Sequence, residues 1–164
     1  LIIIGYSYTK RFTSLCHLIL GLGLALAPIG SYLAVSNEFS LIPVLFSTAV
    51  LFWVSGFDII YSLQDERFDK KQQLYSIPVI IGKKNALQVA KFLHLISLII
   101  LVNSGYIGEF GGLYWIGTVI FSILLIYQHT LVKHNDLSKV NLAFFTTNGI
   151  ASVIFGIFVI CDIL

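Results

Sequence analysis

Long apolar stretches separated by short polar connections dominate the pattern of hydrophobic and polar positions along the chain. The complete stretches cover residues 15–35, 41 to about 64, 85–107, 113–132 and 140–164, and we expect residues 1–8 to form the end of a preceding helix. Each complete stretch is close to the roughly 20 residues that an α-helix needs to cross the hydrocarbon core of a bilayer. The runs are continuous and lack the alternation of a membrane β-barrel. The pattern therefore predicts an all-α, polytopic transmembrane helix bundle with five complete spans.

Composition agrees with this class. Hydrophobic residues make up 57% of the 164 residues and charged residues only 11%, whereas soluble domains contain about 25% charged residues. We expect the lipid bilayer, and no nucleic acid, as a partner. The chain lacks methionine and opens on an apolar run with no charged n-region and no cleavage site, so we do not expect this run to be a signal peptide. We expect residues 1–164 to be a single transmembrane domain, the C-terminal part of a larger protein.

The basic residues are confined to alternate connections. All ten lie in, or within about two helical turns of, residues 10–14, 65–84 and 133–139, while the other connections carry Glu38 and Glu109 and no Lys or Arg. We expect residues 65–84 to form an ordered loop. Because basic loops stay in the cytoplasm, the pattern predicts a multi-pass protein of the inner (plasma) membrane, with these connections cytoplasmic and the C-terminus outward.

An acidic segment follows the second complete span. Asp58, Tyr61, Asp65 and Asp69 have the offsets i, i+3, i+7 and i+11, so on one continuous helix they lie within roughly 80° of one another. A line of carboxylates leaving an apolar helix indicates a site for a hard cation such as Mg²⁺. The alternative is a helix that frays into a charged loop. Asp58 favours the site, because a carboxylate inside an apolar segment is costly unless it is used.

Lys10 and Arg11 are expected on the same cytoplasmic face as the acidic segment. Basic side chains beside Mg²⁺-binding carboxylates suit a phosphorylated substrate, because the metal joins carboxylate to phosphate and Lys or Arg neutralises the remaining charge. The alternative is that both residues only set the orientation in the membrane. His17 and His94 lie near the cytoplasmic ends of their helices, and we interpret them as interfacial hydrogen-bonding residues.

Four segments together resemble a known family. Tyr6 and Lys10 form a YxxxK pattern, residues 20–30 form a helix rich in small residues, residues 58–69 end in DxxxD, and residues 76–83 contain Ser-Ile-Pro followed by Gly-Lys. In this order they resemble the UbiA-type intramembrane aromatic prenyltransferases. The resemblance covers essentially the whole chain and is nearest to the 4-hydroxybenzoate polyprenyltransferases.

The resemblance implies a bundle of nine transmembrane helices, of which this chain would be the last five and the end of the one before. It also implies a first acidic motif on an earlier helix, and no Asp precedes Asp58 in this sequence. We therefore expect residues 1–164 alone to be inactive.

The implied reaction moves a polyprenyl group from its diphosphate to 4-hydroxybenzoate or a similar aromatic acid in quinone biosynthesis, with Mg²⁺ as cofactor. Asp65 and Asp69 would bind the metal. Asp58 would support the metal cluster or help to activate the acceptor, and Tyr61 would hydrogen-bond a substrate or a carboxylate, or anchor the helix at the membrane interface. The residues implied at the diphosphate are Tyr6, Lys10 and Arg11.

Two alternatives remain open. The first is the same chemistry on a naphthoate-type acceptor in menaquinone biosynthesis instead of ubiquinone biosynthesis. The second is an ion-coupled membrane transporter that uses Asp58. Against the transporter, the acidic line continues into a loop, and no paired halves with interrupted helices occur in the sequence. A purely structural membrane subunit would leave the acidic segment unexplained.

Overall fold

The computed structural model describes residue 5 and residues 8–164, and over these residues it consists of helices and their connections. The helices are α2 (Cys16–Ser36), α3 (Leu41–Ser62), α4 (Glu66–Lys71), α5 (Ile77–Ile107), α6 (Gly112–Leu131), the π-helix η1 (Leu142–Thr147) and α7 (Asn148–Ile163). The helix end expected over residues 1–8 lies mostly outside the described residues. Five helical segments are long and apolar enough to cross a membrane, η1 and α7 together forming the last. The prediction of an all-α bundle of membrane-spanning helices is confirmed.

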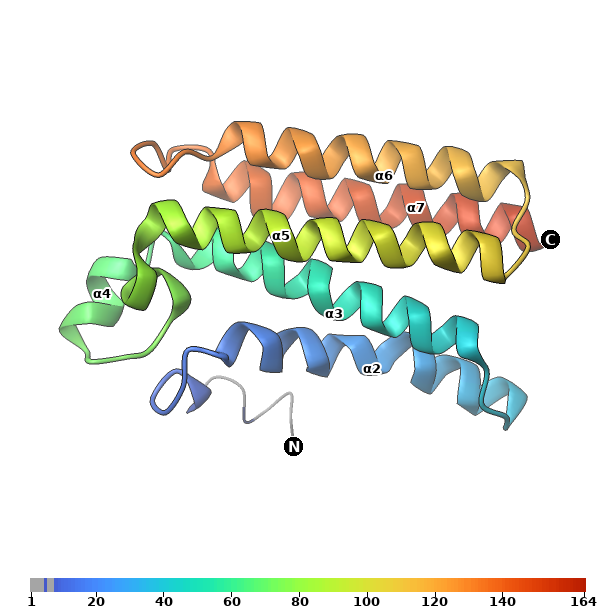
Figure 1. Cartoon of the computed structure of the whole chain (residues 1–164), viewed down its shortest axis with the longest axis horizontal. Coiled ribbons are helices and arrows are strands. Elements are labelled where there is room, and N and C mark those ends of the chain that lie inside the picture. The colour runs from blue at the N-terminus through green and yellow to red at the C-terminus, as the bar shows by residue number, and fades with distance from the viewer. Residues whose placement is uncertain (1–4, 6–7) are drawn as a thin grey trace.

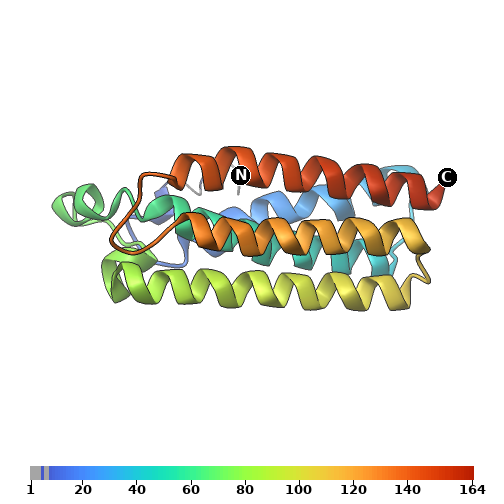
Figure 2. The same ribbon diagram turned by 90° about the horizontal axis from the view of Figure 1, so that it is seen from above.

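The long helices run side by side along one axis (Figures 1 and 2). α3 packs between α2 and α5, and α6 packs against α7. One apolar cluster joins α3 and α5 to the last turn of α6 and the first turns of η1, with Ile59, Ile60 and Ala90 at its centre. A second cluster lies further along the bundle and includes Ala49, Phe121 and Ala151. Both clusters hold α3 at the centre of the fold.

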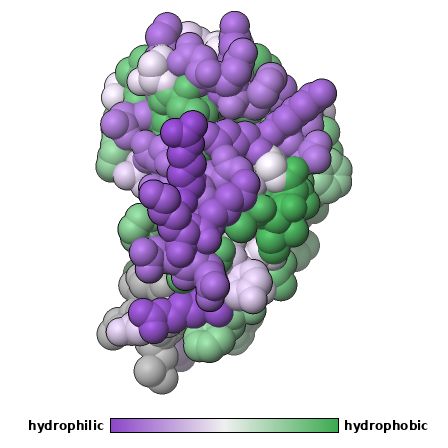
Figure 3. All heavy atoms as spheres, turned by 90° about the vertical axis from the view of Figure 1, so that its left-hand side faces the viewer, coloured by the Kyte–Doolittle hydropathy of each residue, from purple (hydrophilic) through white to green (hydrophobic). Residues whose placement is uncertain are grey.

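The two ends of the bundle differ in polarity. α4, the start of α2 and the connection between α6 and η1 gather at one end (Figure 1), and the surface of that end is largely hydrophilic (Figure 3). The connections at residues 37–40 and 108–111 lie at the other end with the C-terminus. There the Asp162 carboxylate accepts hydrogen bonds of 2.6, 3.0 and 3.1 Å from the N–H groups of Gly111, Leu113 and Tyr114. The three basic connections therefore share one end, as the sequence pattern predicts.

The third span begins earlier than its hydropathy predicts. We expected residues 77–84 to belong to a loop, but α5 starts at Ile77, with Ser76 at the N-cap position and Pro78 in the first turn. Proline suits a first helical turn, because its missing N–H is not needed there. Gly82 then departs from helical geometry, with φ 76° and ψ 161°, a conformation that glycine adopts without a steric cost. The short helical turn before Gly82 extends α5 into the polar end of the bundle.

Gly21 allows a close approach of α2 to α3. A methyl group at this position would collide with Ser55 Oγ and would lie 2.5 Å from the carbonyl oxygen of Leu51. Small residues at helix interfaces let membrane helices approach in this way, so the small-residue pattern of this span has a structural role at Gly21.

We expect Gly21→Ala to lower the free energy of unfolding by about 1–3 kcal/mol, because the added carbon forces α2 away from the α3 backbone. Gly30→Ala is the matched control on the same helix, since nothing lies within 4 Å of a carbon added there. Thermal unfolding in detergent would measure both variants. An equal loss of stability in the two would contradict the close packing described here.

Candidate functional site

The acidic residues belong to two helices. α3 ends at Ser62 and α4 begins at Glu66. Between them the N–H groups of residues 63–65 bond to carbonyls three residues earlier, at 3.4, 3.4 and 3.1 Å, which tightens the chain into a turn. The prediction that Asp58, Tyr61, Asp65 and Asp69 share one helix face is therefore wrong. Starting a new helix at this point places acidic residues in its first turn, where the helix dipole stabilises negative charge.

The tertiary structure nevertheless keeps the carboxylates close together. Burial raises the pKa of Asp65, the ammonium of Lys10 opposes that shift, and the neighbouring carboxylates of Asp69 and Asp58 add to it. These charges act on one another because the turn after α3 brings α4 beside Lys10. The site therefore combines acidic side chains with a basic one, although not along a single helix.

Lys10 and Asp69 form the central ion pair of this region. Lys10 Nζ lies 3.2 Å from Asp69 Oδ2, and the Asp69 side chain is only 2% exposed. The backbone carbonyl of Lys10 accepts a 2.6 Å hydrogen bond from the N–H of Tyr75. Contacts at its backbone and at its ammonium thus fix Lys10 against the acidic segment.

Asp58 has a partner that the sequence did not reveal. His17 Nδ1 lies 2.6 Å from Asp58 Oδ2, and the His17 side chain is fully buried, while that of Asp58 stays 21% exposed. We expected His17 to be an interfacial residue, but it belongs to the site. The available signal was a histidine one turn into an apolar helix that follows a basic junction.

Tyr61 lies against aromatic rings of η1. Its ring centroid is 4.2 Å from that of Phe144 and 6.0 Å from that of Phe145, and Phe57 contacts Phe144 from the other side at 5.3 Å. The wider π-helical turn brings the two neighbouring rings of Phe144 and Phe145 to the same tyrosine. Such π-helical turns often occur at functional sites. The described contacts place Tyr61 in an aromatic wall next to Asp58.

The other two residues predicted at the diphosphate are not placed there by the structure. Tyr6 lies outside the described residues. The Arg11 guanidinium lies over the ring of Tyr8, 5.6 Å from its centroid, and across residues 8–164 it forms no ion pair with an acidic side chain. Of the predicted basic residues, the structure brings Lys10 to the acidic segment.

The donor set suits a metal ion that is shared with a substrate. No group of three His, Cys, Asp or Glu side chains able to hold an ion occurs in the part of the chain that the structure describes. Asp65 and Asp69 supply hard oxygen atoms, and Mg²⁺ is commonly bound by one or two carboxylates together with water and phosphate oxygens. Among the described residues the Asp65 carboxylate has no hydrogen-bond or ion-pair partner, while Asp69 is paired with Lys10. These residues fit an ion completed by phosphate oxygens.

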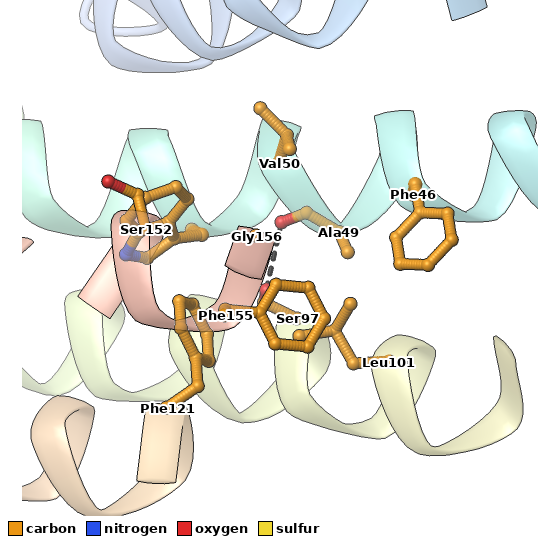
Figure 4. Close-up of a pocket in the computed structure, with 10 residues that line it drawn as sticks. Phe46, Ala49, Val50, Ser97, Leu101, Phe121, Ser152, Phe155 and Gly156 are labelled. Atoms are coloured by element: carbon orange, nitrogen blue, oxygen red, sulfur yellow. Dashed lines mark hydrogen bonds between the residues drawn. The ribbon is translucent and has the colours of Figure 1, made fainter. Parts of the chain in front are cut away.

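An apolar cavity follows α3 away from the acidic end. It measures about 190 Å³ and lies among α3, α5, α6 and α7, with Phe46, Ala49, Leu101 and Phe121 in its wall (Figure 4). A larger groove of about 890 Å³ shares Phe46 with it and extends between α2 and α7. Because helix positions rise by about 1.5 Å per residue, the cavity begins roughly 8 Å along α3 from Asp58, at Trp53, and the groove roughly 12 Å along it, at Val50.

Comparison with known proteins gives consistent matches. The sequence model of the UbiA prenyltransferase family matches residues 1–150. The chain is 29% identical to the 4-hydroxybenzoate octaprenyltransferase of Francisella tularensis subsp. mediasiatica, over 94% of this chain and 54% of that protein. It is also 29% identical to the protein of the same name from Tolumonas auensis, over 95% of this chain and 54% of that protein. The chain spans about half the length of the curated relatives it matches.

A solved structure shares the fold. The apo structure of a UbiA homolog from Aeropyrum pernix K1 superposes with a TM-score of 0.86 at 30% sequence identity, over 99% of this chain and 61% of that chain. Together with the five apolar helices, this match makes the chain a multi-pass membrane protein.

Proposed function

The chain belongs to the UbiA prenyltransferase family, and from that membership we propose that the protein transfers a polyprenyl group from its diphosphate to 4-hydroxybenzoate or a similar aromatic acid in quinone biosynthesis. The observation that carries the proposal is the Lys10–Asp69 ion pair beside the partly buried Asp65, with an apolar cavity and groove further along α3. A polyprenyl diphosphate needs charged side chains for its diphosphate and an apolar space for its isoprenoid tail. The names of the relatives in two bacteria support the choice of acceptor.

Residues 1–164 supply one acidic segment, and the complete site needs more. In the proposal, further helices of the same protein contribute a second group of carboxylates, and residues 1–164 alone are inactive. Two findings support this: the chain spans only about half of its curated relatives, and the described residues contain no complete metal-ligand set.

In the proposal, the diphosphate of the prenyl donor binds at α4. Asp65 and Asp69 would hold Mg²⁺, which when bound would neutralise charge on the diphosphate and make it a better leaving group. Lys10 lies within 3.2 Å of Asp69, so its ammonium is in place to neutralise part of the remaining charge as the C–O bond of the donor breaks and the electron pair leaves with the diphosphate. Tyr6 and Arg11 remain proposals as further diphosphate contacts.

In the proposal, the aromatic acceptor binds and reacts at α3. An electron-rich ring carbon of the aromatic acid attacks C1 of the allylic group, a C–C bond forms, and the ring loses a proton. Asp58 keeps an exposed edge, so it is able to accept a hydrogen bond or the proton from the acceptor. The rings of Tyr61 and Phe144 form an apolar wall, which excludes water from the reacting carbon.

The reaction site lies on the cytoplasmic side of the inner membrane in this proposal. The three connections that carry the basic residues lie at the same end of the bundle as α4 (Figure 1), and basic connections are retained in the cytoplasm. The isoprenoid tail extends from this end along the apolar groove.

We expect membranes that contain the full-length protein to convert a labelled polyprenyl diphosphate and 4-hydroxybenzoate into a lipid-soluble product. EDTA should lower the rate by at least about 100-fold, because several kcal/mol of charge compensation are lost, and added Mg²⁺ should restore it. Membranes without the protein are the control. Product with a naphthoate and none with 4-hydroxybenzoate would assign the protein to menaquinone biosynthesis. No transfer to any aromatic acceptor would overturn the proposed function.

A further inference from the structure

His17 joins three separate parts of the fold. It is the second residue of α2, its ring bonds to Asp58 on α3, and Nε2 of the same ring lies 3.4 Å from the backbone nitrogen of Ile77, the first residue of α5. Its own carbonyl accepts a 3.1 Å hydrogen bond from the Ser55 hydroxyl, three residues before Asp58. A fully buried histidine with partners on every polar atom of its ring has a defined orientation.

These contacts also define where the ring carries its proton. A backbone N–H only donates, so Nε2 accepts the hydrogen bond from Ile77. A neutral imidazole with an accepting Nε2 carries its proton on Nδ1, which then donates to Asp58 Oδ2 at 2.6 Å. Ile77 needs this acceptor because the first N–H groups of a helix have no partner within the helix, and Ser76 before it provides no side-chain cap.

We propose that His17 is a positioning residue that holds the Asp58 carboxylate for the acceptor by donating Nδ1–H to one of its oxygens. This inference rests on the proposed function, in which Asp58 contacts the aromatic acid. One carboxylate oxygen is fixed by the buried ring, and the 21% exposure of the Asp58 side chain leaves part of the group accessible. His17 touches no substrate itself.

The same ring links Asp58 to the segment that holds Lys10. The N–H of Tyr75, two residues before Ile77, bonds to the carbonyl of Lys10, and the Cys16 thiol lies 3.7 Å from the carbonyl of Tyr75. The donor-side lysine and the acceptor-side aspartate are therefore held in one network that passes through residues 75–77 and His17. A shift of the ring would move Asp58 relative to the diphosphate.

Two substitutions separate positioning from simple packing. Asparagine places its amide nitrogen close to the position of histidine Nδ1, so His17→Asn keeps a donor for Asp58 and loses the acceptor for Ile77. His17→Leu keeps a similar volume and loses both. We expect His17→Leu to lower the turnover number by about 100-fold, the size of effect that a misplacement of about 1 Å produces, with little change in the KM for the polyprenyl diphosphate. His17→Asn should retain most of the turnover.

A double-mutant cycle with Asp58→Asn in the full-length protein completes the test. If His17 acts through Asp58, His17→Leu should have almost no further effect on turnover in the Asp58→Asn background, because interacting residues are not additive. The same fold-loss in both backgrounds, or a loss in His17→Asn as large as in His17→Leu, would overturn the positioning role.

A measurement that needs no activity separates this inference from the proposed function. In protein labelled with ¹⁵N at histidine, the His17 ring should show a protonated Nδ1 and an unprotonated Nε2, and Asp58→Asn should shift the Nδ1 signal. If the wild-type protein transfers no prenyl group while this signature is present, the proposed function fails and the His17–Asp58 bond stands. An unprotonated Nδ1 would overturn the inference by itself.

Discussion

Asp65→Ala in the full-length protein is expected to reduce Mg²⁺-dependent prenyl transfer by at least about 100-fold, because the substitution removes a metal ligand and with it several kcal/mol of charge compensation on the leaving diphosphate. Asp65 is the best placed carboxylate for this role. Burial raises its pKa, and within the described residues no hydrogen bond or ion pair engages it. A metal ion and a phosphate group would satisfy this side chain.

The matched control for Asp65 is its neighbour. Glu66 is the next residue and carries the same charge, but Lys70 at 2.6 Å and Lys83 at 3.5 Å already pair with it, and the hydrogen bond from Lys70 lowers its pKa. Glu66→Gln should therefore leave the transfer rate nearly unchanged. Rates would be measured with the labelled-donor assay over a range of Mg²⁺ concentrations. Equal losses in both variants would show that the charge of α4 matters and that Asp65 is not a specific ligand.

Exchanging the charges of Lys10 and Asp69 is expected to separate stability from activity. Lys10→Asp alone places two carboxylates against each other, and Asp69→Lys alone places two ammonium groups together in a site where Asp69 is 2% exposed. Removing one partner of a buried ion pair costs about 3–5 kcal/mol, and we expect the lower end here because Lys10 is 27% exposed. The double variant Lys10→Asp with Asp69→Lys restores the pair and should recover most of the stability.

Activity should not return with the charge exchange. A lysine at position 69 cannot bind Mg²⁺, so the double variant should stay at least about 100-fold less active than the wild type although it is folded. Thermal unfolding in detergent and the transfer assay would be run on the same preparations. Recovery of activity together with stability would show that Asp69 serves only as the partner of Lys10, and the metal would then have to be bound by other carboxylates.

The membrane spans follow from the sequence because their cause is local. A run of about 20 apolar residues has few alternatives in a bilayer, and the alternate basic connections already group the ends of the helices. The sequence does not predict the start of α5 at Ile77, because the Ser-Ile-Pro segment followed by Gly82 has the hydropathy of a loop. In the structure, the backbone is helical on both sides of Gly82.

The arrangement of the site depends on contacts that one sequence does not contain. Helical spacing predicted a single acidic face. However, the chain leaves α3 after Ser62 through a turn whose hydrogen bonds join residues three positions apart, and periodicity does not show where a helix ends. The pairing of His17 with Asp58 depends on the register between α2 and α3, which Gly21 sets by close packing. The resemblance favoured Lys10 over Arg11 at the diphosphate, and in the fold Lys10 pairs with Asp69 while Arg11 lies over the ring of Tyr8.

In the proposed function, the break between α3 and α4 places the two substrates against two different parts of the fold. Asp58 and the aromatic wall belong to α3 and η1, whereas Asp65 and Asp69 belong to α4 and the turn before it. Substitutions in the aromatic wall would change the shape of the proposed acceptor site. They would leave the proposed diphosphate contacts at α4 unchanged. In such a scaffold, the proposed acceptor preference is able to change without any change at the proposed metal site.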